Sequence, residues 1–86
     1  MLKPNQKICL YVEDGVPCGE YTSIKEAYEG LQENKKIDIE MCGQSGAKFF
    51  DYYFELHTET DDTLYITDVK IYKRNNKYFM KSLKNN

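Results

Sequence analysis

The sequence predicts an α+β fold in which one α-helix packs on an antiparallel sheet of four to six strands, in the order β-(β)-α-β-β-β-β. Three observations lead to this prediction. Residues 24–33 carry apolar side chains at helical spacing. Several other segments alternate apolar and polar residues, as strands buried on one face do. Turn signals separate these segments at short intervals, which is typical of antiparallel strands.

The length of 86 residues suits a single domain, residues 1–86, with ends that fray at about 1–5 and 84–86. Hydrophobic residues make up 41% of the chain, which favours a folded domain over a disordered one. The apolar runs are far shorter than the roughly 18 residues that cross a bilayer, so no membrane association is expected.

The first predicted strand is residues 7–12, where Ile8, Leu10 and Val12 share one side. The Asp-Gly pair at residues 14–15 predicts a tight turn, because both positions accept a positive φ. Residues 16–21 could return as a short second strand, although Pro17 and a nearby glycine weaken it.

The helix prediction begins with a capping box, because Ser23 precedes Glu26 by three residues. The apolar face follows at i, i+3, i+4 and i+7: Ile24, Ala27, Tyr28 and Leu31. Gly30 inside this segment costs about 1 kcal/mol relative to Ala. Asn34 is the predicted end of a helix of about three turns, residues 24–33.

Two strands are predicted after the helix. Residues 37–41 alternate, with Ile37, Ile39 and Met41 on one side. Residues 47–57 form the next strand, and Thr58 to Asp62 form an acidic turn. In residues 47–57 the expected core face consists of Phe50, Tyr52, Phe54 and Leu56. The opposite face consists of Phe49, Asp51, Tyr53, Glu55 and His57.

Residues 63–73 predict a long strand whose alternation has a flaw. Leu64 and Ile66 share one phase, whereas Val69 and Ile71 share the opposite one. A one-residue bulge near residues 67–68 would bring all four side chains to the core face.

A two-residue hairpin turn is predicted at Asn75-Asn76, followed by a last strand over residues 78–83. This turn pairs Ile71 with Met80 and Tyr72 with Phe79. The terminal hairpin thereby becomes the last unit of the sheet.

The order of elements is similar to that of cystatin and monellin, in which a sheet grips one helix. The likeness concerns element order only. Residues 44–46, Gln-Ser-Gly, lack the valines and alanine of the glutamine-containing hairpin motif of cystatins. The resemblance therefore implies a fold and no protease-inhibitor function.

The three cysteines, Cys9, Cys18 and Cys42, are an odd number, which favours reduced thiols and a cytoplasmic location, with one disulfide plus a free thiol as the alternative. The start of the chain has too short an apolar run for a signal peptide. Lys, Asn, Ile and Tyr are plentiful, as in AT-rich coding sequences, which hints at a low-GC bacterium or at a phage or mobile element living in one.

Catalytic residues are not expected. His57 is the only histidine, so any Cys-His or Ser-His chemistry would have to use it, and no local signature selects a partner thiol. The cysteines and His57 lack the closely spaced Cys pair of a zinc site, and no phosphate-binding glycine motif is present. No cofactor and no metal are therefore expected, and the predicted class is a non-enzymatic binding protein.

The preferred site is an acidic, aromatic face on residues 49–62. Exposed aromatic rings among carboxylates suit docking onto a protein with a basic surface. A phage- or mobile-element-type inhibitor that blocks a host protein fits this pattern, while a two-sided core with solvated acids explains it equally well. The candidate residues are Phe49, Asp51, Tyr53, Glu55, Glu59, Asp61 and Asp62.

The alternative site is the terminal hairpin, in which cations alternate with aromatic residues, a pattern that can track phosphates and stack bases. Its residues are Lys70, Tyr72, Lys73, Arg74, Lys77, Phe79 and Lys81. The net charge of −2 is unlike that of a dedicated nucleic-acid binder. Sequestration of a small molecule by the Tyr-rich sheet and a homodimer through an edge strand are also open.

Overall fold

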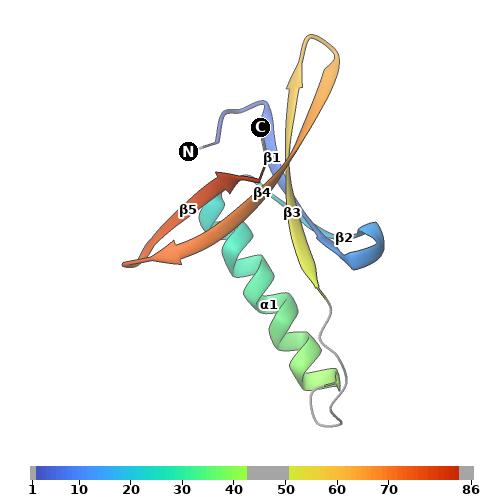
Figure 1. The fold of residues 1–86 in the computed structure, drawn as a ribbon, viewed down its shortest axis with the longest axis vertical. Helices are drawn as coiled ribbons and strands as arrows, with labels where there is room; N and C mark the ends of the chain where they lie inside the picture. The colour runs from blue at the N-terminus through green and yellow to red at the C-terminus, as the bar shows by residue number, and fades with distance from the viewer. Residues whose placement is uncertain (1, 43–50, 84–86) are drawn as a thin grey trace.

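A computed structural model describes residues 2–42 and 51–83 and confirms the predicted α+β class (Figure 1). One helix and five strands follow in the order β-β-α-β-β-β. The strands are β1 (Gln6–Val12), β2 (Val16–Tyr21), β3 (Tyr52–Thr60), β4 (Thr63–Arg74) and β5 (Lys77–Ser82). The helix is α1 (Ile24–Cys42), and a single 3₁₀ turn, η1 (Glu13–Gly15), joins β1 to β2.

The strands form one antiparallel sheet in the order β2-β1-β3-β4-β5, and α1 crosses one face of it (Figure 1). The core lies between this inner face and the helix. Its buried members are Ile8, Leu10, Ala27, Phe54, Val69 and Ile71. We call the other face of the sheet the outer face.

The turn after β1 confirms the expectation drawn from Asp14 and Gly15, whose φ values are 80° and 81°. Strand β2 is present and pairs with β1, with a break in register between Leu10 and Tyr11. This irregularity lies opposite Pro17, which pairs with Tyr11 and cannot donate a ladder hydrogen bond.

The helix begins where the capping box predicts, because the Ser23 hydroxyl accepts a hydrogen bond of 3.1 Å from the amide of Glu26. The predicted end near residue 33 is wrong, and so is the predicted strand at residues 37–41: α1 continues to Cys42. Asn34 does not end the helix, and its side-chain amide donates a hydrogen bond to the carbonyl of Gly30 one turn earlier. Residues 31–42 contain no glycine or proline that would break the helix.

The second half of α1 gains a tertiary contact from β3. The hydroxyl of Tyr52 donates a hydrogen bond to the carboxylate of Asp38. Ile37 and Ile39 remain 44% and 53% exposed, so their alternation, which suggests a strand, creates no buried face.

Strand β3 confirms the two faces expected for residues 52–57. Phe54 is buried and Tyr52 and Leu56 pack against the core, whereas Tyr53 is exposed on the outer face. Phe49 and Phe50 lie outside the described residues. The strand runs on to Thr60, so the predicted turn over residues 58–62 shortens to Asp61 and Asp62, whose φ values of 49° and 64° define a type I′ turn.

The bulge predicted in β4 is wrong. The β3–β4 register is continuous from Thr60↔Thr63 to Phe54↔Val69. Leu64 and Ile66 therefore lie on the outer face, 48% and 53% exposed. The physical reason is that the tip of the β3–β4 hairpin projects beyond the helix, where neither side of the sheet has a core to bury (Figure 1).

The terminal hairpin agrees with its prediction. Asn75 and Asn76 have φ values of 52° and 63°, and both predicted pairs, Ile71↔Met80 and Tyr72↔Phe79, are present. No helix in the described part of the chain has both the length and the apolar character needed to cross a bilayer. Fraying of the ends stays a prediction, and residues 1 and 84–86 lie outside the described residues.

Candidate functional site

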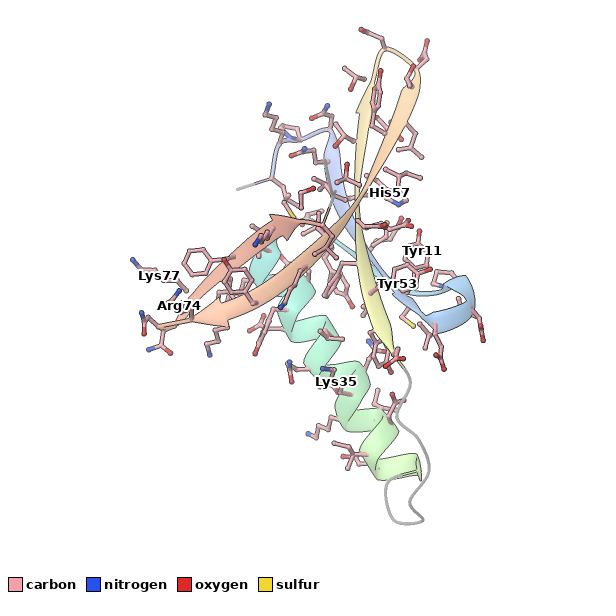
Figure 2. The ribbon with its side chains drawn as sticks, in the orientation of Figure 1. Tyr11, Lys35, Tyr53, His57, Arg74 and Lys77 are labelled. Carbon is pink, nitrogen blue, oxygen red and sulfur yellow. The ribbon has the colours of Figure 1, made fainter. Side chains whose placement is uncertain are left out.

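The acidic, aromatic face is built on β3, whose alternate residues reach the outer face. Tyr53 is stacked on Tyr11 of the neighbouring strand β1, with ring centroids 5.3 Å apart and an angle of 17° between the planes (Figure 2). The two residues are direct register partners. Tyr53 is thus an exposed ring held in place by a second ring, which lowers the entropy cost of using it in a contact.

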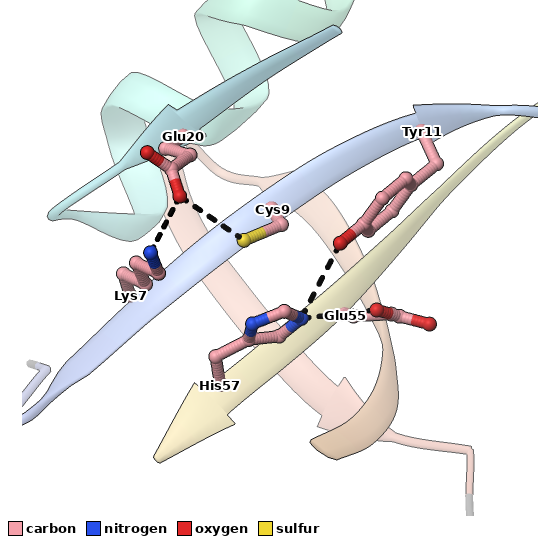
Figure 3. Close-up of polar contacts among 6 residues, drawn as sticks. All are labelled: Lys7, Cys9, Tyr11, Glu20, Glu55 and His57. Carbon is pink, nitrogen blue, oxygen red and sulfur yellow. Dashed lines mark hydrogen bonds and ion pairs between the residues drawn. The ribbon is translucent and has the colours of Figure 1, made fainter. Parts of the chain in front are cut away.

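Glu55 differs from the other carboxylates of this face because it has an internal partner. Its Oε1 lies 3.0 Å from Nε2 of His57, and the two side chains are only 22% and 11% exposed (Figure 3). The Tyr11 hydroxyl lies 3.5 Å from the same nitrogen. Glu55 therefore contributes to the fold of the face more than to its exposed charge.

The pKa of Tyr11 is raised to about 12, first by burial and then by the neighbouring Cys9 and Glu55. The phenol therefore keeps its proton at neutral pH. The arrangement of Tyr11, Glu55 and His57 is a hydrogen-bonded support for Tyr53.

A second polar cluster joins β1 to β2 on the same face (Figure 3). Lys7 Nζ lies 2.5 Å from Glu20 Oε1, and the thiol of Cys9 points to the same carboxylate at 4.0 Å. The hydrogen bond and charge of Lys7 lower the pKa of Glu20. Burial, followed by the charge of Glu20, raises the pKa of Cys9, which is the opposite of what activates a thiol nucleophile.

The remaining acids of the face are exposed. Asp51 lies just before β3, Asp61 and Asp62 form the turn of the β3–β4 hairpin, and Glu59 lies near the end of β3. From Tyr53 to Glu59 the strand extends about 20 Å. In the described part of the chain no cation lies within ion-pair distance of these four carboxylates. The face is therefore a long stripe of negative charge without close ion pairs, with Lys7 as the cation whose charge acts on Glu59.

The tip of this hairpin is tied to the N-terminal segment. The side-chain amide of Asn5 donates a hydrogen bond of 2.7 Å to the carbonyl of Glu59, and the Glu59 amide donates to the carbonyl of Asn5 at 3.0 Å. These two bonds fix the direction in which the acidic hairpin leaves the sheet.

The basic alternative lies at the other end of the same outer face. Tyr72 of β4 and Phe79 of β5 are register partners and stack with centroids 5.4 Å apart. Lys70↔Lys81 and Arg74↔Lys77 flank them on either side, so the aromatic pair lies between two pairs of like charge. Figure 2 shows Arg74 and Lys77 at the far tip of this hairpin.

Lys73 lies on the opposite face of the terminal hairpin. Its ammonium group is 5.6 Å from the ring centroid of Tyr78, and that ring meets Tyr28 of α1 edge-on. This lysine therefore connects the hairpin to the helix through the aromatic ring. None of the described carboxylates is within ion-pair distance of the other basic residues of the hairpin.

Three features of the hairpin and of the acidic face were missed by sequence reasoning. Leu64 and Ile66, assigned to the core, lie on the outer face, and Tyr65, on the opposite side of the hairpin, is 58% exposed. The flaw in alternation at residues 64–71 was the available signal, because it marks the point where β4 leaves the core. Tyr11 was not recognised as the partner of Tyr53, since the pairing of β1 with β3 could not be read from the sequence.

Within residues 2–42 and 51–83, no group of three or more His, Cys, Asp or Glu side chains is placed to hold a metal ion. Comparison with known proteins gives no match to a family model, to a curated protein or to a solved structure.

Proposed function

We propose that this protein binds a partner protein with a basic surface through its acidic face and thereby blocks that surface. The observation that supports the proposal is the stripe along β3: four exposed carboxylates without ion-pair partners, with Tyr53 fixed among them by its stack on Tyr11. Complementary charge speeds association and selects the partner, whereas a rigid aromatic ring provides a contact of high energy per residue.

The location of Leu64 and Ile66 on the outer face strengthens this proposal. These apolar side chains are about half exposed and belong to the same hairpin as Glu59, Asp61 and Asp62. Apolar contact surrounded by charge is the usual anatomy of a protein interface. The acidic face thus offers negative charge that attracts a basic partner and apolar surface that becomes buried when the partner binds.

The test is capture of a partner by the immobilised full chain, its identification, and measurement of its affinity for variants. We expect Asp61→Asn/Asp62→Asn, which removes two charges and suits the positive φ of the turn, to weaken the complex by about tenfold, with a loss that shrinks at high salt. The matched control is Glu29→Gln/Glu33→Gln, which makes the same change of charge at exposed positions of α1 and keeps the affinity. Equal affinity of wild type and Asp61→Asn/Asp62→Asn would refute the proposal.

A second function, binding of single-stranded nucleic acid, is favoured by the terminal hairpin. The Tyr72–Phe79 stack between two cationic pairs matches the combination of base stacking and phosphate contacts that such sites use. A labelled single strand should then bind with an affinity that falls steeply with salt and falls again in Lys70→Glu/Lys81→Glu. An affinity that changes neither with salt concentration nor with the two substitutions would exclude this function.

A further inference from the structure

Strand β4 changes partner at Val69, and this leaves part of one edge uncovered. Residues 63–69 pair with β3, and residues 69–74 pair with β5 on the opposite side. The side of β4 that pairs with β5 at residues 69–74 has no neighbouring strand at residues 63–67 in the described part of the chain.

The backbone groups on this edge belong to Leu64 and Ile66. The amide of Leu83 donates a hydrogen bond of 2.9 Å to the carbonyl of Asp68, so the Asp68 carbonyl faces the β5 side. In an antiparallel ladder every second residue presents its N–H and C=O to the same neighbour. The same side therefore carries the N–H and C=O of Leu64 and Ile66, for which the described residues provide no partner.

This edge lacks the usual protection against pairing with another chain. Natural edges are shielded by a lysine, a proline or a bulge. Residues 63–67, Thr-Leu-Tyr-Ile-Thr, contain neither residue type, and the β3–β4 register has no bulge there. A shallow groove follows the edge and is lined by residues 65–68 and Leu83.

The charge around the edge indicates what would pair with it. Glu59, Asp61, Asp62 and Asp68 surround residues 63–67, and no Lys or Arg occurs between residues 51 and 69. A second copy of this chain fits poorly, because antiparallel self-pairing centred on Tyr65 places Asp62 opposite Asp68 of the other copy. Like charges directly opposite each other destabilise a pair of strands.

We propose that the edge of β4 at residues 63–67 takes up an extended, basic segment of the partner as an added strand. The inference rests on the proposed function and deepens it, since it specifies how the partner binds. Main-chain hydrogen bonds to Leu64 and Ile66 supply affinity, while Lys or Arg side chains of the segment meet the surrounding carboxylates.

The test uses the full chain and a short synthetic peptide that alternates Lys with Val. A second peptide has the same sequence and charge but is methylated at every backbone nitrogen. It cannot donate hydrogen bonds to the carbonyls of Leu64 and Ile66, and its methyl groups prevent it from lying close enough to the edge to accept from their N–H groups. Amide exchange followed by NMR reports on each residue. We expect the plain peptide to slow exchange at Leu64 and Ile66 and the methylated peptide to leave both amides unchanged.

A variant of the protein gives an independent readout. Ile66→Pro removes one edge donor at a position where proline is tolerated, because that N–H faces away from β3. Ile66→Val is the matched control that keeps the donor. The plain peptide should bind the proline variant about tenfold more weakly and the valine variant as it binds wild type.

Equal binding of both peptides would overturn strand addition and leave an acidic surface that recognises charge alone. No binding of either peptide would also overturn it, while the proposed function would still be decided by the captured partner and Asp61→Asn/Asp62→Asn. If amide exchange at Leu64 and Ile66 of the free chain becomes slower as the protein concentration rises, the edge pairs with a second copy of the chain. That result would overturn the inference.

Discussion

The ring of Tyr21 lies directly against Gly30, so that a Cβ atom added to this glycine would overlap the ring. Tyr21 closes β2, and Gly30 is in the middle of α1, which makes their contact the point where the edge of the sheet meets the helix. The glycine that weakens the helix in isolation therefore provides the space for a core aromatic residue.

Gly30→Ala is expected to destabilise the protein by about 1 kcal/mol, because overpacking costs about 1–3 kcal/mol and the better helix propensity returns about 1 kcal/mol. Urea unfolding measures the change. In a Tyr21→Ala background the same substitution should stabilise the fold by up to about 1 kcal/mol. A stabilising effect of Gly30→Ala in the wild-type background would show that the two residues are not in contact.

Stability should fall in alkaline solution. Burial raises the pKa of Tyr11 from 10 to about 12, and it also raises the pKa of Tyr21 and Tyr52. A phenol that holds its proton more tightly when folded contributes stability that is complete below pH 10 and is lost as pH rises to about 12. Urea midpoints over this range should fall less steeply in Tyr11→Phe, and its absorbance titration should lose a late component. An unchanged slope and titration would contradict the assignment.

Leu10 and Leu64 provide a matched pair that tests the two halves of the sheet. Leu10 is fully buried between the sheet and α1, whereas Leu64 is 48% exposed. We expect Leu10→Ala to cost about 2–5 kcal/mol and Leu64→Ala less than about 1 kcal/mol in thermal or urea unfolding. Similar large losses of stability at both positions would instead support a bulge in β4 that places Leu64 in the core.

The pair Lys70↔Lys81 separates binding from stability. Two like charges lie directly opposite each other on the outer face, so Lys81→Glu should raise the unfolding free energy by a few tenths of a kcal/mol, about the worth of an opposite-charge pair. If the hairpin binds nucleic acid, the same change weakens that binding. A variant that melts at a lower temperature than wild type would contradict the register of β4 and β5.

Local signals in the sequence were sufficient to predict the elements whose ends are marked by capping or turn residues. Ser23 marks the start of α1, and Asn75-Asn76 sets both the turn and the register of the last hairpin. The alternation of residues 52–57 separated the buried Phe54 from the exposed Tyr53. In each case neighbouring residues determine the outcome.

Features that depend on distant contacts could not be predicted in this way. The helix continues past Asn34 because nothing local stops it and Tyr52, far along the chain, binds Asp38. Leu64 and Ile66 are exposed because the hairpin extends past the helix, which depends on the length of both elements. For the candidate site, the charges of the acidic face were readable, but its support by Tyr11 and its open edge were not.

Binding of a partner at the acidic face is tested most directly by a hydrogen–deuterium exchange footprint of the complex between the full chain and its captured partner. We expect slower exchange at residues 59–66 on binding, with the terminal hairpin at residues 70–81 unchanged. Slower exchange confined to residues 70–81 would contradict binding at the acidic face, because the partner would then be bound by the basic end of the sheet.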